Sequence, residues 1–191
     1  LLARIAQEAP GVRLRFVNKT DKDNALLRDG SVDLETGVVD ASASPEVLTQ
    51  ALFRDRLIGV VRSGHPLSQG EVSAQRFAQG RHVYVSRRGQ DRGQIDDALE
   101  ALGLSRQIST LVAGFSTAIA LARDSDLIAS VPERYTANQR EGLFRFTLPV
   151  ALPTFTVAML WHPRQDADLA HRWLRSCLRE VCQQSVQSPL P

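Results

Sequence analysis

The 191-residue sequence has few cysteines and no long apolar run, and both absences exclude classes of protein. Its two cysteines, Cys177 and Cys182, lie five residues apart within one predicted helix. That spacing points the side chains to different sides of the helix, which argues against a disulfide between them and favours a reducing, cytoplasmic setting. No stretch of about 18 apolar residues predicts a membrane-spanning helix. Residues 1–11 also lack the long apolar core of a signal peptide.

The sequence lacks a strong excess of charge of either sign. Its 23 basic and 21 acidic residues give a net charge of +2, which is too balanced to indicate a nucleic-acid-binding surface. The hydrophobic content of 43% and the charged content of 23% are typical of globular domains. A chain of this length forms one large domain or two small ones and buries about 70% of its unfolded surface.

Sequence patterns of catalysis and of metal binding are missing as well. The four histidines are scattered, and none has metal-ligand spacing to another histidine or a carboxylate: His65, His82, His162 and His171. No Gly-x-Ser-x-Gly, P-loop or Gly-x-Gly-x-x-Gly pattern occurs. Asp96 and Asp97 are predicted to be solvated charges on an exposed helix face, and Cys177 is predicted to be buried. We therefore predict no catalytic residue, metal or cofactor.

The most informative stretch is 108–132, which predicts a strand, a turn, a short helix and a second strand. Gly114 would allow a turn with positive φ, and Ser116 or Thr117 would cap the helix. Residues 127–131 form a near-continuous apolar run, which is typical of a buried parallel strand. Such a unit places a helix N-terminus at the carboxyl end of a parallel sheet, where open α/β sheets bind small ligands.

The rest of the chain alternates between helix and strand patterns. Helices are predicted over 1–9, 20–29, 73–78, 95–102, 132–140 and 166–183, and strands over 12–17, 32–38, 47–53, 57–61, 83–86, 143–146 and 155–161. This order is typical of α/β proteins with parallel sheets. Crossing segments near 59–66 and 148–155 would let the chain leave a first half and return to it. We expect a two-lobed ligand binder, with lobe I formed by 1–62 and 154–191 and lobe II by 63–153.

Several segments resemble the effector-binding (co-inducer) domain of LysR-type transcriptional regulators. ALLRDGSVDL at 25–34 resembles the family's "L…L..G.lDl" segment, and LFRDRLIGVVRSGHPL at 52–67 resembles its "l..d.l.lv...HPl" segment. Residues 116–134 resemble the family's helix–strand–"P.r" segment. The segments WHPRQDADLAHRWLRSCL and VSRRGQDRGQIDDALEALGL are similar to the branch that regulates nodulation and the degradation of aromatic compounds. The similarity covers essentially the whole chain.

The resemblance implies an α/β, two-lobed, periplasmic-binding-protein-like fold. Each lobe would be a mostly parallel sheet flanked by helices, and two crossover segments would join the lobes. An aromatic or carboxylate effector in the interlobe cleft would modulate DNA binding by an N-terminal winged helix-turn-helix domain, which we expect to be absent from this chain. The family also implies a homodimer or homotetramer, for which the helices over 1–9 and 117–123 are candidates. The alternatives are a periplasmic-type solute-binding protein, which shares the fold, and an enzyme on a similar fold.

In lobe I, the resemblance places the ligand at the start of the helix after the strand 12–17. Asn18, Lys19 and Thr20 occupy the position at which a family hydroxyl faces the effector. A helix N-terminus there would offer free N–H groups to a carboxylate or phenolate, and Lys19 would add positive charge. An N-cap role alone is an equal alternative for Thr20.

In lobe II, the matching group is Phe115, Ser116 and Thr117, in which Phe115 would form a wall against an aromatic ligand. A core phenylalanine followed by an ordinary cap remains the alternative. Ser86 is predicted to end a strand that points toward the same cleft. Arg62, at the first crossing, would either reach the cleft or cover the hinge.

Overall fold

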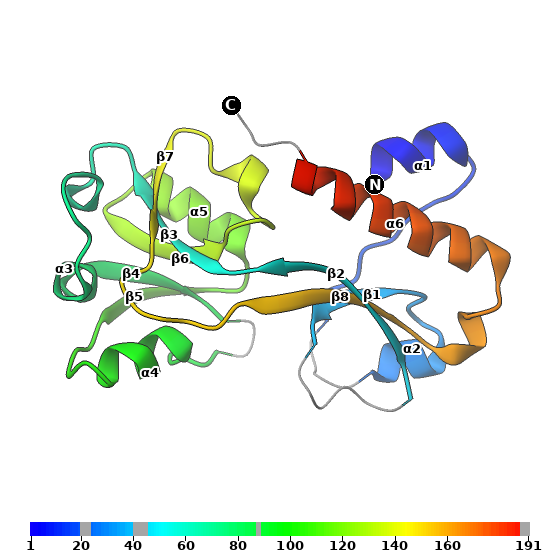
Figure 1. Cartoon of the computed structure of the whole chain (residues 1–191), viewed down its shortest axis with the longest axis horizontal. Coiled ribbons are helices and arrows are strands. Elements are labelled where there is room, and N and C mark those ends of the chain that lie inside the picture. The colour runs from blue at the N-terminus through cyan, green and yellow to red at the C-terminus, as the bar shows by residue number, and fades with distance from the viewer. Residues whose placement is uncertain (20–23, 40–45, 87–88, 188–191) are drawn as a thin grey trace. The chain divides into compact units, whose positions relative to one another are not determined.

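The computed structural model describes residues 1–19, 24–39, 46–86 and 89–187 and divides the chain into two compact units. The first unit comprises Leu1–Arg54 and Phe155–Pro191, and the second comprises Asp55–Thr154 (Figure 1). The first boundary therefore lies at 54/55, whereas the sequence placed it at 62/63. The reason is that the strand over Leu57–Arg62 pairs with two strands of the second unit.

The second unit is built on a five-stranded sheet in the order β5-β4-β6-β3-β7. Its strands are β3 (Leu57–Arg62), β4 (Arg81–Val85), β5 (Gln107–Val112), β6 (Leu127–Pro132) and β7 (Leu143–Thr147). The pairs β4–β5 and β4–β6 are parallel, whereas β3 runs antiparallel to both of its neighbours, β6 and β7. The α/β class is confirmed, but the expectation of a mostly parallel sheet is wrong because β3 runs against the direction of β4, β5 and β6.

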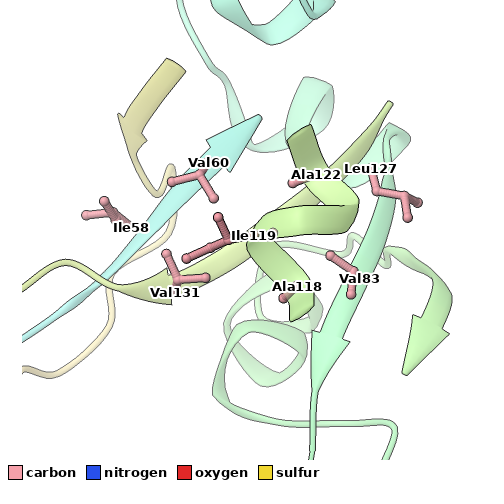
Figure 2. Close-up of a cluster of buried hydrophobic side chains, with 9 residues drawn as sticks. Ile58, Val60, Val83, Ala118, Ile119, Ala122, Leu127 and Val131 are labelled. Atoms are coloured by element: carbon pink, nitrogen blue, oxygen red, sulfur yellow. The ribbon is translucent and has the colours of Figure 1, made fainter. Parts of the chain in front are cut away.

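Helices cover both faces of this sheet, which explains the near-continuous apolar run of β6. Successive β6 side chains point to opposite faces: Ala129 packs in one buried cluster and Ile128 in another. The first cluster contains Ile119 of α5 (Phe115–Arg123), which Figure 2 shows beside Val60 and Val131. The second cluster contains side chains of α3 (Ala74–Gln79) and α4 (Gln94–Glu100).

One glycine in β3 is required by a close side-chain contact. Gly59 lies opposite Phe146 of β7, and a Cβ at position 59 would lie 2.2 Å from the Phe146 ring. Phe146 in turn packs edge-on against Phe77 of α3, with ring centroids 6.2 Å apart. The absence of a side chain at Gly59 therefore lets an aromatic side chain join β7 to the second cluster.

The segment 132–140 differs from its prediction as a surface helix. It contains only a 3₁₀ turn, η2 (Ala137–Gln139), and two of its polar residues are buried. The Thr136 hydroxyl donates to the Pro132 carbonyl at 2.6 Å, and the Arg140 guanidinium donates to the Glu133 carbonyl, also at 2.6 Å. These bonds close a tight turn directly after β6.

The first unit contains a three-stranded sheet in the order β1-β8-β2. Its elements are α1 (Leu2–Glu8), α2 (Ala25–Asp29), β1 (Glu35–Val38), β2 (Leu48–Asp55), β8 (Phe155–Trp161), a 3₁₀ turn η3 (Pro163–Gln165) and α6 (Leu169–Gln187). β1 and β8 pair antiparallel, so this sheet is not mostly parallel either.

The predicted strand 12–17 is wrong, although its alternation of apolar and polar residues is real. Residues 12–17 form no strand in the structure. Val12, Phe16 and Val17 are 47%, 77% and 50% exposed. A strand needs a neighbour that accepts its backbone hydrogen bonds, and no described strand of this chain pairs with this segment.

Buried polar side chains join α6 to the rest of the first unit. The Arg175 guanidinium stacks over the Trp161 ring, with its central carbon 4.4 Å from the ring centroid, and donates to His171 Nδ1 at 2.6 Å. The Cys177 thiol is buried, and burial raises its pKa above the ordinary value. Cys177 and Cys182 form no disulfide with each other, as the helical spacing predicted. Within the described residues, no helix has the length and apolar character needed to cross a bilayer.

Candidate functional site

The carboxyl edge of the parallel strands in the second unit brings four of the predicted site residues together. β4, β5 and β6 run parallel and end at Val85, Val112 and Pro132. The Ser86 amide donates to the Val112 carbonyl at 2.9 Å, so Ser86 lies directly beside the end of β5. α5 begins three residues after Val112, with Phe115, and therefore starts at this same edge. The sequence correctly located this edge.

The N-terminus of α5 differs in detail from its prediction. The N-cap is Gly114 with φ −148° and ψ 151°, so the backbone is extended and the expected positive φ is wrong. The helix begins at Phe115, so neither Ser116 nor Thr117 is the cap. The Gly114 carbonyl accepts the Ala118 amide at 3.2 Å, but glycine has no side chain that could accept a hydrogen bond from the N–H groups of residues 115–117. These N–H groups and the positive end of the helix dipole favour a bound anion.

The side chains of the first turn present one aromatic ring and two hydroxyl groups. Phe115 is half-buried on the first cluster, and its ring meets the Tyr135 ring edge-on at a centroid distance of 6.3 Å. The Ser116 hydroxyl donates to Gln139 Oε1 at 2.8 Å. Ser116 and Thr117 are both exposed. Sequence reasoning missed Tyr135 and Gln139, since both lie in the turn that was predicted as a surface helix.

The structure does not bring Arg62 to this edge. Leu57, at the start of β3, pairs with Pro132 at the carboxyl end of β6. Arg62 lies five residues further along β3, which corresponds to about 17 Å of extended chain. There its guanidinium pairs with Asp126 Oδ1 at 2.6 Å. Placing Arg62 with the other predicted residues is therefore wrong, because β3 runs opposite to β6.

Two of the three predicted residues of the first unit lie within the described part of the chain. Asn18 is exposed, and the Lys19 ammonium pairs with Glu35 Oε1 of β1 at 2.6 Å. Thr20 lies outside the described residues. The positive charge expected from Lys19 is therefore balanced by a carboxylate on the neighbouring strand, and an anion there would share the ammonium with Glu35.

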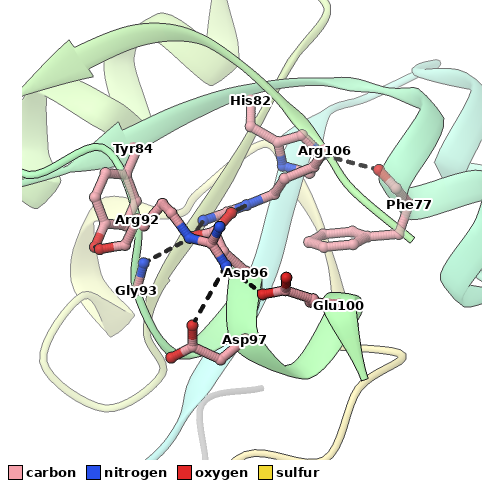
Figure 3. Close-up of polar contacts among 9 residues, drawn as sticks. All are labelled: Phe77, His82, Tyr84, Arg92, Gly93, Asp96, Asp97, Glu100 and Arg106. Atoms are coloured by element: carbon pink, nitrogen blue, oxygen red, sulfur yellow. Dashed lines mark hydrogen bonds and ion pairs between the residues drawn. The ribbon is translucent and has the colours of Figure 1, made fainter. Parts of the chain in front are cut away.

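A second polar cluster of the second unit is buried beside β4 (Figure 3). The Arg106 guanidinium, 1% exposed, donates to both carboxylate oxygens of Asp96 at 2.7 and 2.9 Å and lies over the Tyr84 ring. Asp96 also accepts the Gly93 amide at 2.8 Å, and its pKa is lowered by these bonds despite partial burial. The prediction that Asp96 is solvated is therefore wrong, whereas its neighbour Asp97 is exposed.

The histidines have structural roles. His65 and His162 each accept a backbone N–H at Nδ1, at 3.0 and 3.2 Å, and so cap a 3₁₀ turn. His82 is fully buried, and its Nε2 lies 2.9 Å from the Phe77 carbonyl. Burial lowers the pKa of His82 to about 4. Over the described ranges, no group of three or more His, Cys, Asp or Glu side chains is placed to hold a metal ion.

The second unit places a helix start at the carboxyl edge of its parallel strands, with no metal-binding cluster among the described residues. Comparison with known proteins identifies the family. The family described as LysR substrate binding domain matches residues 1–183. The chain belongs to this LysR substrate-binding domain family. The resemblance found in the sequence motifs is confirmed, and the fold is the two-lobed, periplasmic-binding-protein-like α/β fold of LysR effector-binding domains.

The relatives of this LysR domain are transcriptional regulators. It is 32% identical over 188 residues to nodulation protein D 3 of Rhizobium leguminosarum bv. phaseoli, covering 93% of this chain and 60% of the relative. It is 30% identical over 190 residues to the transcriptional activator NagR of Ralstonia sp, covering 95% of this chain and 61% of NagR. The chain thus spans about three fifths of the length of these relatives.

A solved structure agrees with this assignment. A probable transcriptional regulator from Pseudomonas aeruginosa superposes with a TM-score of 0.81 and 27% identity, covering 94% of this chain and 60% of that one. These relatives favour a regulator's effector-binding domain over the solute-binding alternative. Transcriptional regulators of this family are not enzymes.

Proposed function

We propose that this LysR domain is the small-molecule sensing and oligomerisation domain of a cytoplasmic DNA-binding transcriptional regulator, without enzymatic activity of its own. The family match over residues 1–183 supports this reading, together with the start of α5 at the carboxyl edge of three parallel strands. Contact with DNA is proposed for a separate winged helix-turn-helix domain of the whole regulator. Effector binding would act on that domain by shifting the population of two arrangements of the regulator.

The proposed effector is an aromatic or carboxylate compound. The first-turn N–H groups of α5 would donate hydrogen bonds to its carboxylate, since Gly114 has no side-chain oxygen that competes for them. The Phe115 and Tyr135 rings, which already meet edge-on, would contact an aromatic ring. The hydroxyl groups of Ser86 and Thr117 would fix its orientation. For the first unit, ligand contact by Asn18, Lys19 and Thr20 stays a prediction.

Self-association is the second part of the proposal, as a homodimer or homotetramer. The helices over 1–9 and 117–123 stay the predicted interface; in α5, Ala118, Ile119 and Ala122 pack in the unit's own core, whereas Ala120 is exposed. The first 17 residues, which include the helix over 1–9, expose larger apolar side chains. Leu2 and Phe16 are 61% and 77% exposed, and the alternating segment 12–17 lacks a paired strand among the described residues. A partner that supplied a strand edge would bury these side chains.

The ligand proposal is tested at Thr117, an exposed first-turn residue. Thr117→Glu places a carboxylate where the ligand's carboxylate would lie, and a first-turn acidic residue is itself compatible with the helix. Thr117→Gln is the matched control of similar size without charge. Benzoate and a panel of aromatic and aliphatic carboxylates would be screened against wild type and both variants by thermal denaturation.

At a ligand concentration of 100 Kd, wild type and Thr117→Gln should gain about 2.7 kcal/mol of stability. Thr117→Glu should gain little, while its unfolding temperature without ligand remains within a few degrees of wild type. A carboxylate that stabilises Thr117→Glu as well as wild type would contradict the assigned site. A panel in which no compound stabilises wild type would contradict the proposed chemistry of the effector.

A further inference from the structure

One buried carboxylate holds the end of β2 to the turn that follows β6. β2 ends at Asp55, the residue at which the second unit begins, and Asp55 is 5% exposed. Its Oδ1 accepts the amide N–H of Arg56 at 2.8 Å and that of Arg134 at 2.9 Å. Its Oδ2 accepts the Tyr135 amide at 3.0 Å. Three backbone donors thus bind one ionised side chain, and such charge-assisted bonds are the strong ones.

A surface ion pair supports the same junction. The Glu133 amide donates to the Arg56 carbonyl at 2.8 Å. The Arg56 guanidinium pairs with both oxygens of the Glu133 carboxylate, at 2.6 and 3.3 Å. Since the Arg56 side chain is 53% exposed, this pair contributes little compared with the buried Asp55 bonds. Among the side chains that join residues 55–56 to the turn, Asp55 is therefore the more buried connection, beside the backbone bond from Glu133 to Arg56.

The turn held by Asp55 touches α5 at two places. Tyr135, whose amide binds Asp55, packs its ring edge-on against Phe115, the first residue of α5. Gln139, at the far end of the turn, accepts the Ser116 hydroxyl at 2.8 Å. The contacts therefore form a short path within the second unit from the end of β2 to the N-terminus of α5.

We propose that Asp55 is a positioning residue for the N-terminus of α5. It fixes the turn 133–136, the turn fixes the Tyr135 ring, and the ring fixes Phe115 at the helix start. A change in the chain direction where β2 enters the second unit would move the ligand-binding turn with it. That this turn binds an effector rests on the function proposed above, whereas the coupling itself is measurable without any ligand.

The test compares Asp55→Asn with Arg56→Gln by NMR of the whole chain. Asparagine keeps the size of aspartate and one acceptor, but its NH₂ group faces an amide donor in place of a carboxylate oxygen. In Asp55→Asn, the Tyr135 amide should exchange with solvent about tenfold faster, and the amide resonances of 115–118 should shift. Arg56→Gln removes only the surface ion pair, so its shifts should stay within a few residues of 56 and 133.

A second variant, Tyr135→Leu, tests whether the effect of Asp55 reaches residues 115–118 through the Tyr135 ring. It also provides a test if Asp55→Asn does not fold. Tyr135→Leu, at a side chain that is 62% exposed, should by itself shift the amide resonances of 115–118. Adding Asp55→Asn to Tyr135→Leu should then produce no further shift at these positions.

The proposal is overturned if either Asp55→Asn or Tyr135→Leu alone leaves the amide resonances of 115–118 unchanged. It is also overturned if Asp55→Asn causes the same shifts in the Tyr135→Leu variant as in wild type. If no compound of the carboxylate panel stabilises wild type while the variants show the predicted shifts, the proposed effector chemistry is contradicted and the coupling is supported.

Discussion

The stability of the second unit should depend on pH through one buried histidine. His82 is fully buried, packs edge-on against the Phe77 ring at 4.6 Å, and has Nε2 at 2.9 Å from the Phe77 carbonyl. Its Nδ1 has no hydrogen-bond partner among the described residues. Nε2 therefore carries the hydrogen, and a proton on Nδ1 would be a buried charge without an acceptor.

The size of this pH effect on stability follows from the pKa of His82, which burial lowers from 6.5 to about 4 in the folded chain. Between these two values the unfolded chain binds the proton more readily than the folded chain does. The contribution of neutral His82 to the free energy of unfolding is fully present above pH 6.5 and is lost as the pH falls toward about 4. At 1.36 kcal/mol for each pKa unit, the loss amounts to about 3 kcal/mol. His65, whose pKa is also lowered mainly by burial, changes stability in the same direction.

The matched variant is His82→Gln, whose amide retains a donor for the Phe77 carbonyl but does not titrate. Urea unfolding would be followed by amide resonances of the second unit at several pH values between 7 and 4. Tryptophan fluorescence reports the first unit separately, because both tryptophans lie there. Between pH 7 and pH 4, the free energy of unfolding of wild type should fall by about 3 kcal/mol more than that of His82→Gln. Equal losses, or a His82 ring that titrates near pH 6.5, would refute the reasoning.

Two further perturbations test the polar cluster and the exposed N-terminal segment. Asp96→Asn leaves the buried Arg106 guanidinium without a counter-charge, so it should lower the free energy of unfolding in urea by about 3–5 kcal/mol. The control Asp97→Asn, at an exposed carboxylate, should change this free energy by less than about 0.5 kcal/mol. A cost below about 1 kcal/mol for Asp96→Asn would contradict the buried ion pair. Phe16→Glu should shift the chain toward monomer in sedimentation velocity without altering its unfolding midpoint, with Arg15→Glu as the control for added charge. An unchanged oligomer in the Phe16 variant would exclude this segment from the interface.

Local sequence patterns predicted most of the strands and helices of the second unit. The run 127–131 is buried on both faces because helices cover both sides of β6, as a continuous apolar strand requires. The edge that carries α5 also followed from local sequence, because a strand that passes directly into a helix places the helix start at the strand's carboxyl end. The ordered motifs identified the family, and the family match over residues 1–183 confirms it.

Strand direction and pairing were decided only by the tertiary structure. Apolar alternation at 12–17 is compatible with a strand, but pairing depends on whether another segment offers its backbone edge. Arg62 was misplaced because a sequence pattern does not show that β3 runs against β6. Asp96 was taken as solvated because its partner Arg106 lies ten residues away, beyond the helix that carries Asp96.

The sequence by itself therefore determined the family, through several short motifs in a fixed order, and the α/β class and the position of the α5 turn, through local patterns. The tertiary structure decided which side chains complete that turn. Tyr135 and Gln139 reach α5 from a segment that begins after β6, and Asp55 reaches that segment from the end of β2. These hydrogen bonds and this ring contact join residues that are 20 to 80 positions apart, and only the folded sheet brings them together.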